Sequence, residues 1–127
     1  MISRRMQIVR IYADGDGASH FDEVTVSLTP KDFAPPAPPF SVSEATPAAQ
    51  LLYFEMPSGW HGTPHPAPRR QVYIGTAGTL RVTVSDGEER ILDPGAVVLL
   101  EDVDGVGHTT EVVSDEPARG VFVQLPS

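Results

Sequence analysis

The chain has 127 residues, 40% of them hydrophobic, so we expect one packed core and a single domain spanning residues 1–127. Its 9 Lys and Arg residues against 17 Asp and Glu residues give a formal net charge of −8, and a surface of this sign repels nucleic acids and anionic membranes. Because the chain has no cysteine, disulfides, thiolate catalysis and cysteine-ligated metal sites are excluded.

The N-terminal segment carries Arg4 and Arg5 but no apolar run behind them, which does not fit a signal peptide. No window of the sequence approaches the roughly 20 consecutive apolar residues of a membrane-spanning helix. We therefore expect a cytoplasmic protein without nucleic-acid or membrane partners.

Beyond this segment, the chain consists of short stretches in which apolar and polar residues alternate, separated by turn residues. In residues 21–28, for example, Val24, Val26 and Leu28 fall on one face. Nine strands are predicted in chain order: residues 7–13, 21–28, 51–56, 69–75, 79–85, 88–92, 96–100, 108–113 and 120–125. Short strands about ten residues apart predict an all-β sandwich or closed barrel with little helix.

Residues 30–39 form a proline-rich stretch between the second and third of these strands. Proline lacks an N–H and clashes with a helical turn, so the stretch is not a helix. Phe33 and Phe40, on either side of most of its prolines, favour packing on the protein's own surface. We expect an extended loop that wraps the body, and the alternative is a ligand for a proline-binding module.

The side chains that carry chemistry lie in two distant places. Trp60, His61 and His65 precede the predicted strand that contains Gln71, and His108 opens a later strand. Imidazole is a common ligand of transition metals, and the mouth of a barrel can bring such distant segments together. The spacing leaves two interpretations open, a metal site or histidines that only form hydrogen bonds.

Histidine, amide and glycine residues recur at characteristic spacings in the second half of the chain: His65, Gln71, Gly78, Pro94-Gly95 and Gly105-Val106-Gly107-His108. This order resembles the two sequence motifs of the cupins, with Gln71 at the position of the motif glutamate and Ala67 at that of the second histidine. The resemblance covers roughly residues 51–125, while residues 1–50 would supply N-terminal strands and the proline-rich arm. It implies a cupin-type double-stranded β-helix, or jelly-roll barrel.

The resemblance also implies a function. His65, Gln71 and His108 would bind a divalent transition metal (Fe, Mn, Ni or Zn) inside the barrel, and Tyr73 or His61 would be the proton donor. The protein would then be a metal-dependent enzyme of oxygenase, isomerase or lyase type, acting on a small organic molecule. The altered ligand set favours the alternative, a non-catalytic barrel, with or without metal, that binds or senses a small molecule. Whether the protein is an enzyme stays open.

Further candidate binding residues accompany these ligands. Tyr73 follows Gln71 by two residues, so both side chains leave the same face of the strand, with Arg69 at its rim. A phenol and a guanidinium at a pocket mouth suit an anionic or hydroxylated substrate. We expect Trp60, the single tryptophan, to line the pocket. Core packing of Tyr73, a solvated Arg69 and Trp60 as a plug for the barrel are the alternatives.

Two further expectations concern the flanks of the barrel. Residues 101–104 are acidic and close in sequence to His108, where a carboxylate could orient the imidazole, although a solvated turn is the interpretation we favour. The resemblance implies a homodimer, in which the N-terminal strand of one chain, residues 7–13, caps an exposed sheet edge of the other.

Overall fold

The computed structural model describes residues 4–126, so Met1 to Ser3 and Ser127 lie outside the described residues. The first three belong to the N-terminal segment that does not fit a signal peptide. The regular secondary structure of residues 4–126 consists of strands joined by turns and loops, and none of these residues belongs to a helix able to cross a membrane. The strands are β1 (Arg4–Ala13), β2 (Ser19–Lys31), β3 (Phe40–Val42), β4 (Gln50–Met56), β5 (Gln71–Ala77), β6 (Leu80–Val84), β7 (Glu89–Leu92), β8 (Val97–Glu101), β9 (His108–Val112) and β10 (Ala118–Gln124). The all-β prediction is confirmed, and each expected strand overlaps one that is present.

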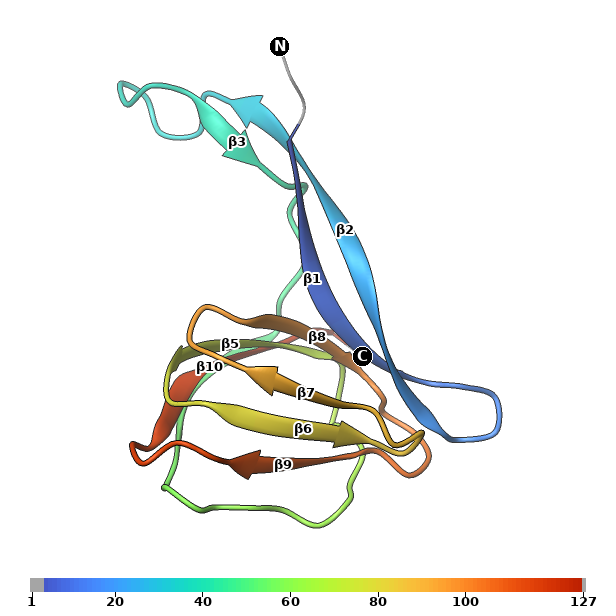
Figure 1. Cartoon of the computed structure of the whole chain (residues 1–127). Coiled ribbons are helices and arrows are strands. Elements are labelled where there is room, and N and C mark those ends of the chain that lie inside the picture. The colour runs from blue at the N-terminus through green and yellow to red at the C-terminus, as the bar shows by residue number, and fades with distance from the viewer. Residues whose placement is uncertain (1–3, 127) are drawn as a thin grey trace.

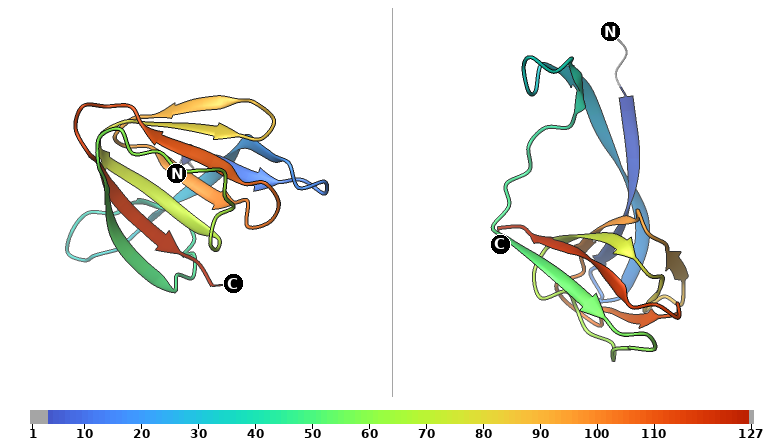
Figure 2. Two further views of the ribbon diagram at one scale, coloured as in Figure 1. Left: turned by 90° about the horizontal axis from the view of Figure 1, so that it is seen from below. Right: turned by 90° about the vertical axis from the view of Figure 1, so that its left-hand side faces the viewer.

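Two sheets lie face to face (Figures 1 and 2). The larger has seven strands in the order β3-β2-β1-β8-β5-β10-β4, and the smaller has three in the order β7-β6-β9. All neighbouring strands are antiparallel except β1 and β8, which run parallel. The sheets curl around a common interior as in a jelly roll but do not join into one closed barrel.

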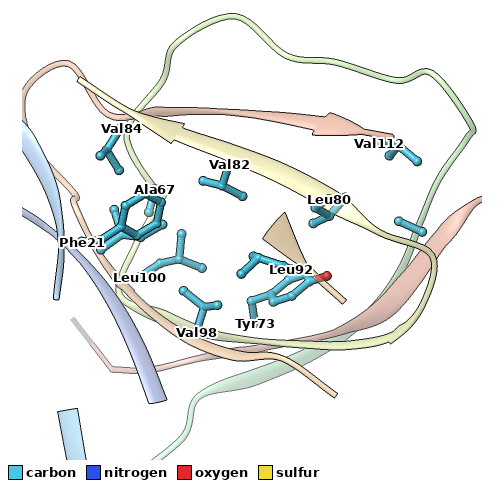
Figure 3. Close-up of a cluster of buried hydrophobic side chains, with 12 residues drawn as sticks. Phe21, Ala67, Tyr73, Leu80, Val82, Val84, Leu92, Val98, Leu100 and Val112 are labelled. Carbon is cyan, nitrogen blue, oxygen red and sulfur yellow. The ribbon is translucent and has the colours of Figure 1, made fainter. Parts of the chain in front are cut away.

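The core lies between these sheets because each strand sends alternate side chains inward. Leu80, Val82 and Val84 of β6 face Val98 and Leu100 of β8, and all five are buried (Figure 3). Burying an aliphatic side chain of this size stabilises the fold by about 1.5–3 kcal/mol. The alternation along β6 therefore has its physical origin in this two-layer packing, whereas Val24, Val26 and Leu28 of β2 lie on the opposite, outward face of the larger sheet from the buried Phe21.

A strandless segment, residues 57–70, crosses one end of the fold and runs along β9. His65 and His108 form an isolated antiparallel bridge, with both N···O distances at 3.0–3.1 Å. The close approach requires glycine at Gly107, which has φ +78°, because a Cβ there would overlap the carbonyl group of His65. The bridge brings together two segments of chain that lie more than forty positions apart.

The proline-rich stretch does not wrap the body, contrary to expectation. β1 and β2 belong to the seven-stranded sheet near their shared turn, but residues 4–8 of β1 and 24–31 of β2 extend beyond the neighbouring strand β8, and β3 pairs with this far end of β2 (Figure 1). This pairing holds the prolines at the tip, where Phe33 and Phe40 are 60% and 49% exposed and pack on each other with ring centroids 5.3 Å apart. The aromatic pair therefore packs locally, and β3 is the one strand that the sequence analysis missed.

We expect Gly107→Ala to lower the free energy of unfolding by more than about 2 kcal/mol, because both the positive φ and the clash with His65 oppose the added methyl group. Gly87→Ala is the matched control, since Gly87 also has a positive φ but nothing within 4 Å, and it should cost about 1 kcal/mol. Urea unfolding measures both values. Equal losses for the two variants would contradict the close approach.

Candidate functional site

A cavity of about 90 Å³ opens between the two sheets, at the end crossed by residues 57–70. Most of its wall is formed by aliphatic core side chains, such as Ile11, Leu80 and Val98. Its polar and aromatic lining residues come from the crossing segment and from strands β5 and β9: Trp60, His65, Gln71, Tyr73, His108 and Thr110. The cavity therefore has an apolar body and a group of polar side chains.

His108 is held in one orientation by a buried carboxylate. Its Nδ1 donates to Oδ2 of Asp102 at 2.6 Å, and the two residues are 7% and 0% exposed. A proton fixed on Nδ1 leaves Nε2 of a neutral ring as a hydrogen-bond acceptor or metal ligand. The other carboxylate oxygen of Asp102 has no hydrogen-bond partner among the described residues, which is costly at this depth.

His65 is held in a related way but stands at the surface. Its Nδ1 donates to the carbonyl oxygen of Thr63 at 2.8 Å, so that in the neutral form of the ring Nε2 is the hydrogen-bond acceptor. The rings of His65 and His108 lie 5.2 Å apart at an interplanar angle of 46°. Since His65 and Trp60 are exposed and line the cavity, its mouth lies beside them.

Gln71 and Tyr73 line the cavity from the inward face of β5, as their two-residue spacing predicted. Both are buried, and Oε1 of Gln71 accepts a hydrogen bond from Nε2 of Gln124 at 3.1 Å. Burial raises the pKa of Tyr73 to about 12, so its hydroxyl stays protonated and available as a donor at neutral pH. The amide of Gln71 keeps its NH₂ group for a further partner.

The other two candidate residues lie outside the cavity lining. Arg69 donates from Nε to the carbonyl oxygen of Leu125 at 3.1 Å, so the guanidinium links the crossing segment to the residue that follows β10. His61 forms an isolated backbone β-bridge with Glu111 of β9 and lines a separate depression on the outward side of the three-stranded sheet. The structure thus brings Trp60, His65, Gln71, Tyr73 and His108 together and leaves out Arg69 and His61.

The solvated turn favoured from the sequence is wrong at Asp102, which is fully buried and holds His108 as the alternative interpretation of residues 101–104 had it. The signal for it was the period of two along β8. Val98 and Leu100 face inward, and Asp102 continues the same alternation past the end of the strand. Extending the inward face by one position would have placed this carboxylate beside His108.

The donor set is limited for a metal ion. Within residues 4–126, no group of three or more His, Cys, Asp or Glu side chains is arranged to hold one. Two imidazoles and the amide oxygen of Gln71 remain, and the buried methyl group of Ala67 occupies the position of a further motif histidine. Imidazole nitrogens suit iron, manganese, nickel and zinc, whereas a neutral amide is a weaker ligand than a carboxylate.

Residues 52–124 match the sequence model of the cupin domain. A Cupin 2 conserved barrel domain protein from Salinispora arenicola CNS-205 is similar in structure, with a TM-score of 0.51, 19% identity, and coverage of 80% of this chain and 76% of that one. The cupin domain of Cnp3 from Schizosaccharomyces pombe has a TM-score of 0.52, 12% identity, and coverage of 97% and 84%. No curated protein sequence matches the chain. At these identities, the structural likeness shows the fold alone.

We expect Asp102→Leu to change the tautomer of His108, because Nδ1 then loses the acceptor that holds its proton. In ¹⁵N NMR spectra of the neutral ring, the wild-type protein should show a protonated Nδ1 and the variant a protonated Nε2. Asp104→Leu, in the exposed turn nearby, is the control and should leave the ring signals unchanged. A protonated Nε2 in the wild-type protein would contradict the assigned role of Asp102.

Proposed function

This chain belongs to the cupin domain family, as its two motifs predicted, and we propose that it binds a small organic molecule in the cavity between its sheets. The observation that carries this proposal is the buried carboxylate of Asp102, which costs stability but holds His108 in one orientation in the wall of the cavity. In a purely structural core, a well-packed apolar pair at these positions is often as stable as a buried polar pair, or more stable. The polar pair is therefore best explained by a ligand.

The size of the cavity restricts the ligand. Cavities of about 150 Å³ hold a molecule the size of benzene, so a cavity of 90 Å³ suits a compact molecule smaller than that. Its aliphatic wall, with Leu80 and Val98, favours an apolar body. The cysteine-free sequence supports a cytoplasmic location, so we expect the ligand to be a small cytoplasmic metabolite.

The polar side chains define what the other end of the ligand carries. Tyr73 offers a hydroxyl donor, Gln71 an amide donor, and Nε2 of His108 an acceptor. This combination pairs with a carbonyl or carboxyl oxygen beside a hydroxyl group. Trp60 and His65 at the mouth would cover the bound molecule and exclude water from its polar end.

A metal-dependent enzyme is the second candidate function. The observation that favours it is that both histidines use Nδ1 for a hydrogen bond, the arrangement that prepares Nε2 for a metal. His65, His108 and the amide oxygen of Gln71 would hold iron, manganese, nickel or zinc. When bound, such an ion supplies a Lewis acid that polarises a carbonyl group or activates water. Tyr73 would then hold a proton beside the substrate, and oxygenase, isomerase and lyase chemistry all stay open.

A homodimer is the partner that we propose, supported by the outward face of the seven-stranded sheet. Within residues 4–126, no element packs on this face, and strand register places apolar side chains across it. They are Met6, Ile8, Val24, Val26, Leu51, Tyr53, Val72, Ile74, Val97, Leu99, Val121 and Val123. An apolar face of this extent is typical of an interface. A second copy also offers the same face, so the surface is self-complementary.

The free strand edges supply further contacts for a second copy. Strand β8 pairs with β1 only from Val9 to Tyr12, which leaves the edge of β1 at residues 4–8 unpaired. Strand β4 pairs only with β10 among the described strands. Because Val9–Tyr12 already pairs within the chain, the part available for an exchanged strand is the projecting half of the hairpin rather than all of residues 7–13.

Native mass spectrometry of untagged protein tests the two candidate functions. We expect one small organic molecule bound per chain in wild-type protein and in His61→Ala, and loss of it in His65→Ala, because only His65 lines the cavity. One transition-metal ion with the same dependence would favour the second candidate instead. An empty protein, with a melting temperature unmoved by chelator and by a panel of small hydroxy and keto acids, would contradict both.

Light scattering tests the dimer. We expect a mass twice the 13.7 kDa of one chain, and Leu51→Glu should weaken dimerisation at least about tenfold by placing a charge on the apolar face. Ile91→Glu is the matched control, since Ile91 is 53% exposed against 55% for Leu51 but lies on the three-stranded sheet. A wild-type mass of one chain, or equal effects of both variants, would contradict the proposed interface.

A further inference from the structure

We propose that His20 is a pH-sensitive clasp that fastens the base of the projecting hairpin to the three-stranded sheet. This inference is independent of the ligand and of the dimer proposed above. It concerns a second group of charged residues, none of which lines the cavity, in which one imidazole joins carboxylates from two different turns. Its members are His20 of β2, Asp14 of the β1–β2 turn and Asp86 of the β6–β7 turn.

Both ring nitrogens of His20 contact a carboxylate. Nε2 lies 2.6 Å from Oδ2 of Asp14, and Nδ1 lies 2.7 Å from Oδ2 of Asp86. A neutral imidazole has one N–H, so it can donate to only one of these oxygens, and the second contact then sets a nitrogen lone pair against an anion. Both contacts are hydrogen bonds only when the ring is the imidazolium cation.

The two carboxylates are held in place by the backbone. Oδ1 of Asp14 accepts hydrogen bonds from the amides of Asp16 and Ala18, at 2.8 and 3.1 Å, and Oδ1 of Asp86 accepts one from the amide of Glu88 at 2.8 Å. These bonds fix each turn and keep the second oxygen directed at the imidazole. Neither carboxylate can therefore turn away without giving up bonds of its own when the ring loses a proton.

The clasp spans a junction that neutral hydrogen bonds also hold. Ser19 and Ser85 exchange hydrogen bonds between amide and hydroxyl groups at 2.7 and 2.8 Å, and the hydroxyl of Ser19 donates to the carbonyl oxygen of Gly107 at 2.6 Å. These bonds do not depend on pH in the range where imidazole titrates. Loss of the clasp should thus loosen the turns rather than detach the hairpin or unfold the protein.

Other charged groups around the imidazole are already paired. The Tyr12 ring of β1 packs on His20 with centroids 5.4 Å apart, and Arg10 lies over Tyr12 at 4.4 Å. Arg10 itself pairs with Asp22 of β2 and with Glu101 of β8. In the turn after Asp86, the Glu88 carboxylate pairs with Arg90. The carboxylates of Asp14 and Asp86 are thus the two that bond the ring.

The direction of the pH response follows from these contacts. The hydrogen bond to Asp14, and then that to Asp86, raises the pKa of His20 from its ordinary value of 6.5. The bond to His20 is the main cause that lowers the pKa of Asp14, whereas the pKa of Asp86 is lowered first by the hydrogen bond from the Glu88 amide and then by the bond to His20. A raised histidine pKa means that the clasp contributes its stability at and below pH 6.5 and loses it as the pH rises through the folded-state pKa. The lowered aspartate pKa values keep it closed until the pH falls below their range. The clasp is closed at mildly acidic pH and opens toward alkaline pH.

NMR titration of His20, together with hydrogen exchange of the β1–β2 turn, tests the clasp. We expect a His20 midpoint above 6.5 and a fall in turn protection, corrected for intrinsic rates, of up to about tenfold per unit of pKa shift as the pH passes that midpoint. His20→Gln should remove the pH step, and the matched control His61→Gln, on a histidine that lines a different depression, should keep it.

A second variant covers the case in which His20→Gln does not fold. Asp86→Asn removes one of the two anions and should lower the midpoint of His20 toward 6.5 while retaining the contact to Asp14. A wild-type midpoint at or below 6.5, turn protection that stays constant through the midpoint, or a pH step that survives in His20→Gln would each overturn the proposal.

Discussion

The backbone bridge between His65 and His108 is the contact on which the site depends. It ties a segment without regular structure to the first residue of β9 and sets the distance between two imidazoles that come from distant parts of the sequence. The bridge exists because Gly107 offers neither a Cβ nor a preference for negative φ. Together with the backbone hydrogen bonds of Trp60, Gly62 and Ala67 to neighbouring segments, the bridge fixes the path of residues 57–70 across the end of the sheets and so defines the mouth of the cavity.

A second constraint is electrostatic. Asp102 is fully buried, and one of its oxygens has no partner in the described part of the chain, so this carboxylate lowers the stability of the fold. Its other oxygen orients the ring of His108. The protein places this cost at the polar end of an otherwise aliphatic cavity. The clasp at His20 also combines imidazole with carboxylate, but its two carboxylates lie near the surface, and both oxygens of each accept hydrogen bonds. Asp102 orients the ring of His108, whereas His20 joins the two turns that contain Asp14 and Asp86.

Most of the fold could be predicted from the sequence, because two packed sheets impose a period of two on every strand. The same rule placed Gln71 and Tyr73 together on the inward face of β5. It could not place His61 and His65, which belong to a segment without a period, and only the path of the chain separates them onto different surfaces. The position of the proline-rich stretch could not be predicted either, since it lies at the end of β2 far from the β1–β2 turn and depends on the length of β2 and on its pairing with β3.

The convergence of the two imidazoles is tested most directly by NOE spectra of the wild-type protein with ¹³C-labelled histidine. Rings whose centroids are 5.2 Å apart should give cross-peaks between the ring protons of His65 and those of His108, and the bridge should give a short contact between the backbones of the same two residues. Absence of both, in a protein whose strand NOEs match the two sheets, would show that the crossing segment follows another path and that the proposed site does not form.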